Sequence, residues 1–264
     1  MKKYLAVFKL SLAREFEYRL NFLLGRLRNV IVLLLLFYVW RALTLKTGTF
    51  AGYSGQELIT YVFGVNILRS VIFGIQSRRL ASDINDGSFS KYLTQPLNIF
   101  WFQFFRELGQ RAIHLLSAIF EVIIFVIILK VDIFIQTDVI ILFALLVAAA
   151  LSLALYYLLS YLVSMLAFWS CEAMGPRFLF EWFLEFASGA YFPLSILSQS
   201  IFLGLAFLPF AYLIFFPIEL YLMRISIWQF LFGIGMQIIW ILIVGILCRY
   251  VWNKGLKKYS GEGI

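Results

Sequence analysis

The sequence predicts an all-α integral membrane protein, because of its composition and its apolar runs. Hydrophobic residues make up 63% of the 264 residues, charged residues make up only 14%, and the mean hydropathy is +0.93. A soluble domain carries about 25% charged residues. Residues 139–169 and 227–248 hold no charge, and each run exceeds the roughly 20 apolar residues that cross a bilayer. The runs are continuous rather than alternating, which excludes a membrane barrel.

Predominantly apolar runs predict six transmembrane helices within one domain of residues 1–264. The first has an uninterrupted apolar core from Val30 to Trp40, and each run is long enough to cross hydrocarbon as a helix. The expected helices are residues 22–43, 57–77, 111–130, 139–169, 178–194 and 227–249.

Residues 1–21 predict an amphipathic elbow helix on the membrane surface. Phe8, Leu12, Phe16 and Leu20 recur every four residues among charged positions, which places them on one face of a helix. The basic face would then lie towards lipid headgroups. A plain cytosolic extension of the first transmembrane helix is the alternative.

The stretch before the last transmembrane helix is also apolar. Residues 194–216 carry no charge, but Pro209 and Pro217 divide the stretch into pieces too short to cross. We therefore expect residues 194–226 to form an extracellular re-entrant hairpin that enters the outer leaflet and is supported by surrounding protein.

Basic residues predict the orientation, because Lys and Arg accumulate on the cytoplasmic side of a membrane. With the N-terminus inside, 17 of the 22 Lys and Arg residues fall in cytoplasmic segments, and Arg69 lies within a span. Both termini are therefore expected in the cytoplasm, in a multi-pass protein of a bacterial plasma (inner) membrane that contacts lipid. The net charge of +8 reflects this asymmetry and predicts no nucleic acid partner. The basic residues left outside are Arg41, Lys46, Lys130 and Arg224.

The residues that catalysis requires are sparse. His114 is the single histidine, and the sequence holds no His, Cys or carboxylate cluster at metal-ligand spacing. No phosphate-binding G-x-x-x-x-G-K-[ST] motif occurs. We therefore expect no catalytic residue, no metal site and no cofactor on this chain, so that any work it does is driven by another protein.

Several polar side chains fall inside the predicted transmembrane helices, where they are costly and usually functional. They can line a pathway between helices, or they can form pairs that fix the packing, for instance Arg69 with Glu121. Both interpretations remain open from the sequence. The side chains are Asn66, Arg69, His114, Glu121, Glu181 and Glu185.

The most polar passage follows the second predicted transmembrane helix. In the cytosolic loop of residues 78–110, Gly87 is expected to end a short helix that carries Asp83 and Asp86. Phe89, Tyr92 and Leu93 would then offer an apolar edge to another protein. An ordinary solvated loop is the alternative, and the mixture of aromatic and acidic residues favours docking.

Two motifs carry a resemblance to a known family. The pattern Ile84-x-x-Gly87-x-Phe89-x-x-Tyr92-Leu93-x-x-Pro96-Leu97 resembles the cytosolic loop of ABC-2 type permeases, in particular the subgroup encoded apart from its ATPase. The run Ser188-Gly189-Ala190-Tyr191-Phe192-Pro193-Leu194 is similar to the segment at the outer end of that family's fifth helix. The chain departs from the family at Thr94-Gln95, where Leu-Arg is common, and at Phe89, where leucine is expected.

The resemblance implies an exporter permease that pairs with a second permease subunit, identical or paralogous, and with cytosolic ABC ATPase subunits that bind ATP and Mg²⁺. The loop would couple ATP binding to movement of the membrane helices, and the pathway would lie at the dimer interface. The implied coupling residues are Arg78, Arg79, Asp83, Ile84, Asn85, Asp86, Gly87, Phe89 and Tyr92. The implied pathway residues are Asn66, Arg69, Phe73, Glu121, Phe186 and Tyr191. Gly189 and Pro193 would form an outer gate.

Two other functions compete with this interpretation. A membrane-embedded enzyme acting on lipids would need acid, base or metal-binding groups gathered at one depth, and His114 with Glu121 is a sparse set. A membrane assembly subunit without a transport role is the third hypothesis.

Overall fold

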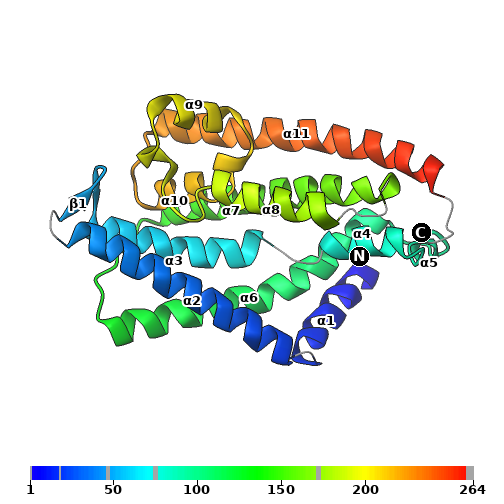
Figure 1. The fold of residues 1–264 in the computed structure, drawn as a ribbon, viewed down its shortest axis with the longest axis horizontal. Coiled ribbons are helices and arrows are strands. Elements are labelled where there is room, and N and C mark those ends of the chain that lie inside the picture. The colour runs from blue at the N-terminus through cyan, green and yellow to red at the C-terminus, as the bar shows by residue number, and fades with distance from the viewer. Residues whose placement is uncertain (1, 18, 46–47, 74–76, 171–173, 260–264) are drawn as a thin grey trace.

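Helices make up most of the chain in the computed structural model, which describes residues 2–17, 19–45, 48–73, 77–170 and 174–259 (Figure 1). The prediction of an all-α architecture is confirmed, apart from a small antiparallel hairpin of strands β1 (Thr49–Phe50) and β2 (Tyr53–Ser54). The α-helices are α1 Lys2–Glu17, α2 Arg19–Thr44, α3 Gly55–Ile72, α4 Ser77–Asn85, α5 Ser90–Leu93, α6 Ile99–Leu129, α7 Val139–Ser164, α8 Met174–Ala187, α9 Gln199–Phe207, α10 Phe215–Tyr221 and α11 Ile227–Lys258. Short 3-10 helices are η1 Met165–Phe168, η2 Leu194–Ile196 and η3 Phe210–Tyr212.

Among the described residues, four helical stretches are long and apolar enough to cross a membrane. Two further helices expected to cross are shorter: α3 has 18 residues and α8 has 14. At 1.5 Å per residue α8 spans roughly 21 Å, less than the hydrocarbon thickness of about 30 Å. The four long stretches are Leu20–Thr44, Ile99–Leu129, Val139–Phe168 and Ile227–Lys258.

Side-chain caps define where several of the helices begin. Ser54 and Ser226 each form a capping box at the start of α3 and α11, and Asn98 caps α6. Asp138 accepts a hydrogen bond from the Ile140 amide at the start of α7. These groups satisfy backbone amides that have no partner within the helix. Lys130 ends α6 in the left-handed conformation, with φ of 47°.

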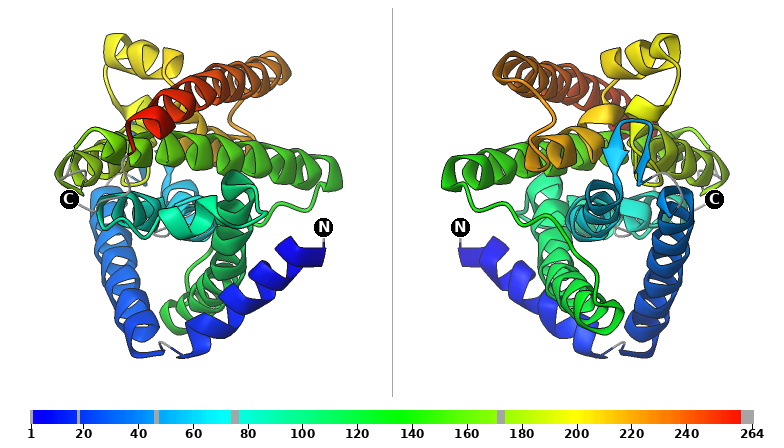
Figure 2. Two further views of the ribbon diagram at one scale, coloured as in Figure 1. Left: turned by 90° about the vertical axis from the view of Figure 1, so that its right-hand side faces the viewer. Right: turned by 90° about the vertical axis from the view of Figure 1, so that its left-hand side faces the viewer.

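Helix α3 lies at the centre of the bundle and is packed between α2, α6 and α7. Half of its 18 residues are buried. Viewed along the long axis, α11 and α9 form one outer layer, α7 and α8 lie beneath them, and α1, α2 and α6 lie on the far side of α3 (Figure 2). A central position lets α3 carry polar side chains that lipid would not tolerate.

The third predicted transmembrane helix begins earlier than the sequence indicated. We expected it at residue 111, after a loop, but α6 already starts at Ile99. Helix α1 packs against its residues from Phe105 to His114. Gly109 makes this contact possible, because a Cβ there would lie 2.6 Å from the Phe8 carbonyl oxygen. The Ser11 hydroxyl donates to the Arg106 carbonyl at 2.5 Å. Thus the predicted elbow is a helix held by protein contacts, and its place on the membrane surface stays a prediction.

The predicted hairpin region folds into η2, α9, η3 and α10. Pro209 lies at the break between α9 and η3, and Pro217 lies in the first turn of α10, where proline is tolerated. The Tyr212 carbonyl accepts from the Ser152 hydroxyl at 2.8 Å and from the Gln237 amide at 3.0 Å. The fold-back is therefore anchored to α7 and α11, while its insertion into a leaflet stays a prediction.

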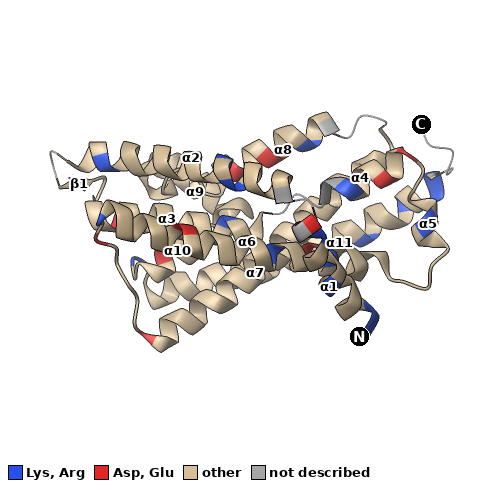
Figure 3. Ribbon diagram, turned by 90° about the horizontal axis from the view of Figure 1, so that it is seen from below, with Lys and Arg blue, Asp and Glu red and all other residues tan. Residues whose placement is uncertain are grey.

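The two ends of the bundle differ in charge and in the elements that form them. At one end, here called the basal end, α1, α4, α5 and the end of α11 come together, and Lys and Arg residues concentrate there (Figure 3). Lys3 donates to the Pro96 carbonyl at 2.8 Å, and Tyr259 donates to the Gly87 carbonyl at 3.0 Å. At the opposite, distal end, Arg224 donates to the Gly52 carbonyl at 3.0 Å. The first and last described residues therefore lie at the same end of the molecule.

Candidate functional site

The loop expected at residues 78–110 ends where α6 begins, and the part before it, residues 77–98, is here called the coupling segment after its expected role. It forms a compact pair of short helices at the basal end. Gly87 adopts φ of +75°, a left-handed conformation that glycine accommodates without strain, and α4 ends just before it, as predicted. Asp86 Oδ1 accepts from the Ser88 amide at 2.9 Å, and the Phe89 amide donates to the Asp83 carbonyl at 2.7 Å. The segment is thus a folded unit rather than a solvated loop.

Phe89 corrects the expectation of an apolar edge for docking. Its side chain is 0% exposed, and Ile84 is buried beside it in the same core. The Phe89 ring meets Phe168 at 5.7 Å and Tyr259 at 5.2 Å between ring centroids. The residue therefore fixes the segment to the bundle and leaves other side chains to face outward.

The outward face of the segment is mostly polar. Leu93 is 48% exposed and is its one large apolar contribution. Arg79, Asn85 and Tyr92 are half-buried, and the side chain of Arg78 lies outside what the structure describes. The exposed side chains are Ser82, Asp86, Lys91, Leu93, Thr94, Gln95, Pro96 and Asn98.

The two acidic residues of the segment sit in different electrostatic surroundings. Burial raises the pKa of Asp83 above 3.8, although the positive charge of Arg106 opposes the shift. Hydrogen bonds from Ser88 lower the pKa of Asp86 below that value. Asp86 therefore keeps its negative charge readily on the outward face. Asp83 lies behind it, where burial disfavours the charged form.

The first polar cluster inside the bundle joins α2, α3 and α6. Arg26 holds Glu121 with two hydrogen bonds, of which Nε to Oε1 measures 2.6 Å, and Asn66 Nδ2 lies 3.4 Å from the same carboxylate. The side chains of Arg26 and Glu121 are 8% and 13% exposed. The suggested pair of Arg69 with Glu121 is therefore wrong, because Arg26 is the partner of Glu121.

The second cluster joins α3 to α8 and the run that follows it. Arg69 Nη2 donates to Glu185 Oε2 at 2.5 Å, and the Tyr191 hydroxyl donates to the same oxygen at 2.6 Å. Phe186 packs on Tyr191 with ring centroids 6.2 Å apart and is largely exposed. Phe73 does not join this cluster, because it packs on Tyr156 at 5.0 Å in the core.

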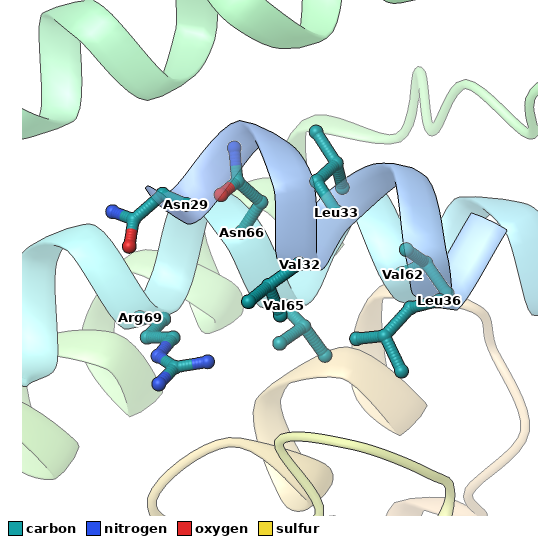
Figure 4. A pocket seen from close by; sticks show the side chains of 8 residues that line it. All are labelled: Asn29, Val32, Leu33, Leu36, Val62, Val65, Asn66 and Arg69. Carbon is teal, nitrogen blue, oxygen red and sulfur yellow. The ribbon is translucent and has the colours of Figure 1, made fainter. Parts of the chain in front are cut away.

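A shallow hollow between α2 and α3 lies next to both clusters. Asn29, Asn66 and Arg69 gather at one end of it, and apolar side chains line the other end (Figure 4). The hollow therefore has a polar and an apolar part within one continuous surface. The apolar lining consists of Val32, Leu33, Leu36, Val62 and Val65.

The distal motif of residues 188–194 is a tight turn against α3 and α10. Gly189 has φ of +82°, and a Cβ there would lie 2.8 Å from the Tyr61 hydroxyl oxygen. Tyr61 donates to the Gly189 carbonyl at 2.6 Å, and Pro193 precedes η2. Glycine is thus required by backbone conformation and by space. A gating role for the turn stays a prediction.

Sequence reasoning missed the aromatic residues that hold the coupling segment from behind. Trp252 on α11, Tyr259 directly after it and Phe168 on η1 surround Phe89. The available signal was the length of α11, which continues for 10 residues beyond Cys248, the last of the uncharged run, to Lys258. Of the two aromatic residues in that extension, Trp252 is partly buried and Tyr250 is exposed, so composition alone does not show which of them packs inward.

Within the described ranges, no group of three or more His, Cys, Asp or Glu side chains gathers in a way that could hold a metal ion. Fold and site together define a multi-pass helical membrane protein with an anchored polar segment at one end and paired charges within the bundle. The sequence model of a family described as "ABC-2 family transporter protein" matches residues 30–263, so the chain belongs to this family. No curated protein and no solved structure matched the chain. Membership makes it a membrane component of an ABC transporter and implies association with an ABC ATPase.

Proposed function

We propose that the chain is the permease subunit of an ATP-driven exporter in a bacterial plasma membrane. It forms the translocation pathway in a dimer, with an identical or paralogous subunit, and is moved by separate cytosolic ATPase subunits. ATP and Mg²⁺ bind to those partners, and this chain is not itself an enzyme. The anchored coupling segment at the basal end is the observation that carries the proposal.

The coupling segment has the properties that a mechanical contact requires. Asp86, Lys91 and Leu93 face outward, while Phe89 and Ile84 fix the segment to the bundle. A force applied to the outer face is therefore passed to the helices instead of being lost in a mobile loop. ATP can shift the helices only if the ATPase contacts two conformations of the permease differently. A rigid attachment transmits that difference from the segment to the helices.

Six crossings of the membrane fit the course of the chain. Besides the four long stretches, α3 runs from the distal end, where Glu57 pairs with Arg224, to the basal half, where the Val71 carbonyl accepts from Arg111. Helix α8 with the turn after it runs back from Arg177, which lies 2.9 Å from the Ser160 hydroxyl, to Ser195 beside Tyr53. This path supports two more crossings, with both ends of the chain on the cytoplasmic side.

The second cluster supports a pathway at a dimer interface. The Arg69 and Glu185 side chains are 23% and 24% exposed at the surface of the single chain, and charges facing lipid are costly. Beside them, α8 exposes Phe178, Trp182 and Phe186. A second subunit or a water-lined path over this face would remove the cost. Export as the direction rests on the family resemblance.

Capture of the ATPase from native membranes tests the proposal. We expect Leu93→Asp to lower the amount captured several-fold, because it puts a charge at the apolar point of the outward face. Leu45→Asp, at an exposed leucine of the distal end, is the matched control and is expected to have no effect. The purified chain alone is expected to show no ATP hydrolysis. Capture of no nucleotide-binding protein by the wild type, or equal loss in both variants, would contradict the proposal.

A further inference from the structure

Helix α11 is longer than a membrane crossing requires. Its 32 residues correspond to roughly 48 Å, against a hydrocarbon thickness of about 30 Å. The uncharged run ends at Cys248, and Arg249, Lys254 and Lys258 follow. The last three turns therefore extend beyond the hydrocarbon at the basal end, where they meet the coupling segment.

Tyr259, directly after α11, binds the turn of the coupling segment. Its hydroxyl donates to the Gly87 carbonyl at 3.0 Å and lies 3.0 Å from the Ser90 hydroxyl, which can donate in return. The Tyr259 ring meets the Phe89 ring edge-on, at an interplanar angle of 89°. One side chain thus holds the backbone of the turn and the aromatic residue that follows it.

Further aromatic contacts join this point to α7. Trp252 meets Phe89 at 5.8 Å and Phe168 at 6.0 Å between ring centroids, and it stacks on Tyr161 at 5.8 Å. Gly255 allows η1 to approach α11, because any Cβ there would overlap the Phe168 ring. Edge-to-face aromatic pairs contribute beyond the area they bury, so the cluster links the coupling segment, η1 and α11 into one packed unit.

We propose that the basal end of α11 is a further attachment of the coupling segment, with Tyr259 and Trp252 as positioning residues. This inference rests on the proposed function. The segment is covalently continuous with α6, and α4 packs directly on α7 and η1, so the aromatic cluster adds the connection to α11. Movement imposed on the segment by an ATPase is thereby transmitted to α11 as well as to α6 and α7.

Protease cleavage after Lys91 tests the attachment without any partner. In membrane vesicles with the basal end accessible, Tyr259→Phe keeps the ring but removes both hydrogen bonds. Cleavage that proceeds through transient opening follows the open population, and losing two hydrogen bonds should raise it about tenfold. Tyr250→Phe is the control, because Tyr250 lies on α11 but is exposed and contacts Lys254 instead. Equal cleavage of wild type and Tyr259→Phe would overturn the attachment.

A distance measurement in the assembled complex tests the transmission. With Cys171 and Cys248 replaced by Ser, spin labels at Lys9→Cys and Lys258→Cys report how α1 on α6 moves relative to α11. Addition of ATP and vanadate is expected to shift this distance in the labelled protein that retains Tyr259. The Tyr259→Phe substitution should reduce the shift while ATPase capture is retained. An undiminished shift would overturn the role of Tyr259. Failure of wild-type capture would refute the proposed function instead, and the cleavage result would still decide the attachment.

Discussion

Charged side chains within the bundle occur in pairs that the helices bring together. Arg26 and Glu121 come from different helices, whereas Arg111 and Glu107 lie one turn apart on α6 at 2.8 Å. In a low-dielectric interior, a pair repays its desolvation only if both partners are present and well oriented. Removing one member leaves an uncompensated charge, which makes these pairs sensitive points for stability.

The pair of Arg26 and Glu121 gives the first prediction. Glu121→Gln or Arg26→Met should each lower the free energy of unfolding in mixed micelles by roughly 3 kcal/mol, because one buried charge remains. The double variant should lose clearly less than the sum. Glu57→Gln is the control, because the Glu57–Arg224 pair is about a quarter exposed and surface pairs contribute at most about 1 kcal/mol. Additive losses in the double variant would show that the two residues are not coupled.

Asp83 gives a prediction about pH. Burial raises its pKa above 3.8 when the coupling segment is packed against the rest of the bundle. The packed segment therefore binds a proton more readily than a segment that has detached from the bundle. The packing of the segment on the bundle is therefore weakened as the pH rises from 3.8 through the raised pKa of Asp83. Acidification strengthens this packing. Asp86 works in the opposite sense, but only below 3.8, because its pKa is lowered.

Hydrogen exchange of residues 82–93, corrected for the intrinsic rates, measures this effect at acidic and at neutral pH. The wild type should be better protected in acid. The segment of the Asp83→Asn variant should be protected at both pH values, because the asparagine side chain cannot become negatively charged in the buried position. A pH dependence that persists in Asp83→Asn would assign the effect to another group, such as Glu15, whose pKa burial also raises.

At the scale of elements, small residues decide where helices approach closely. Gly233 faces the ring of Phe216 on α10, and a Cβ there would overlap it, whereas a Cβ at Gly235 would meet nothing within 4 Å. The two glycines are two residues apart on α11 and point in different directions. The sequence shows two equivalent glycines, but only one is required by packing.

Alanine substitution separates the two glycines. Gly233→Ala should lower the free energy of unfolding by about 1–3 kcal/mol, the usual cost of overpacking a tight contact. Gly235→Ala should be neutral or stabilising by up to about 1 kcal/mol, because alanine is the better helix former. Thermal unfolding of the two variants in the same detergent makes the comparison, and equal midpoints would contradict the packing of α10 on α11.

The elements that the sequence predicted well are those fixed by local signals. Gly87 ends α4 as expected, and the uncharged runs at 139–169 and 227–248 became α7 with η1 and most of α11. What could not be predicted depends on contacts between distant parts. An aromatic residue such as Phe89 in a short polar segment has the same local pattern whether it faces its own helices or a partner. Likewise, Glu121 could pair with any arginine at its depth, and only the arrangement of α2 against α6 selects Arg26.

At the scale of the whole molecule, the arrangement predicts a topology. Lys and Arg residues concentrate at the basal end (Figure 3), and Lys and Arg are retained on the cytoplasmic side during insertion. Single cysteines at Gln95 and Lys257 should therefore react with a membrane-impermeant maleimide only after the cells are permeabilised. A cysteine at Asp132, in the loop after α6 at the distal end, should react in intact cells. All three positions are exposed, so differences in labelling report the membrane side rather than burial. Labelling of Gln95 in intact cells would place the coupling segment outside, where no ATP-driven motor could reach it, and the proposed mechanism would fail for the entire chain.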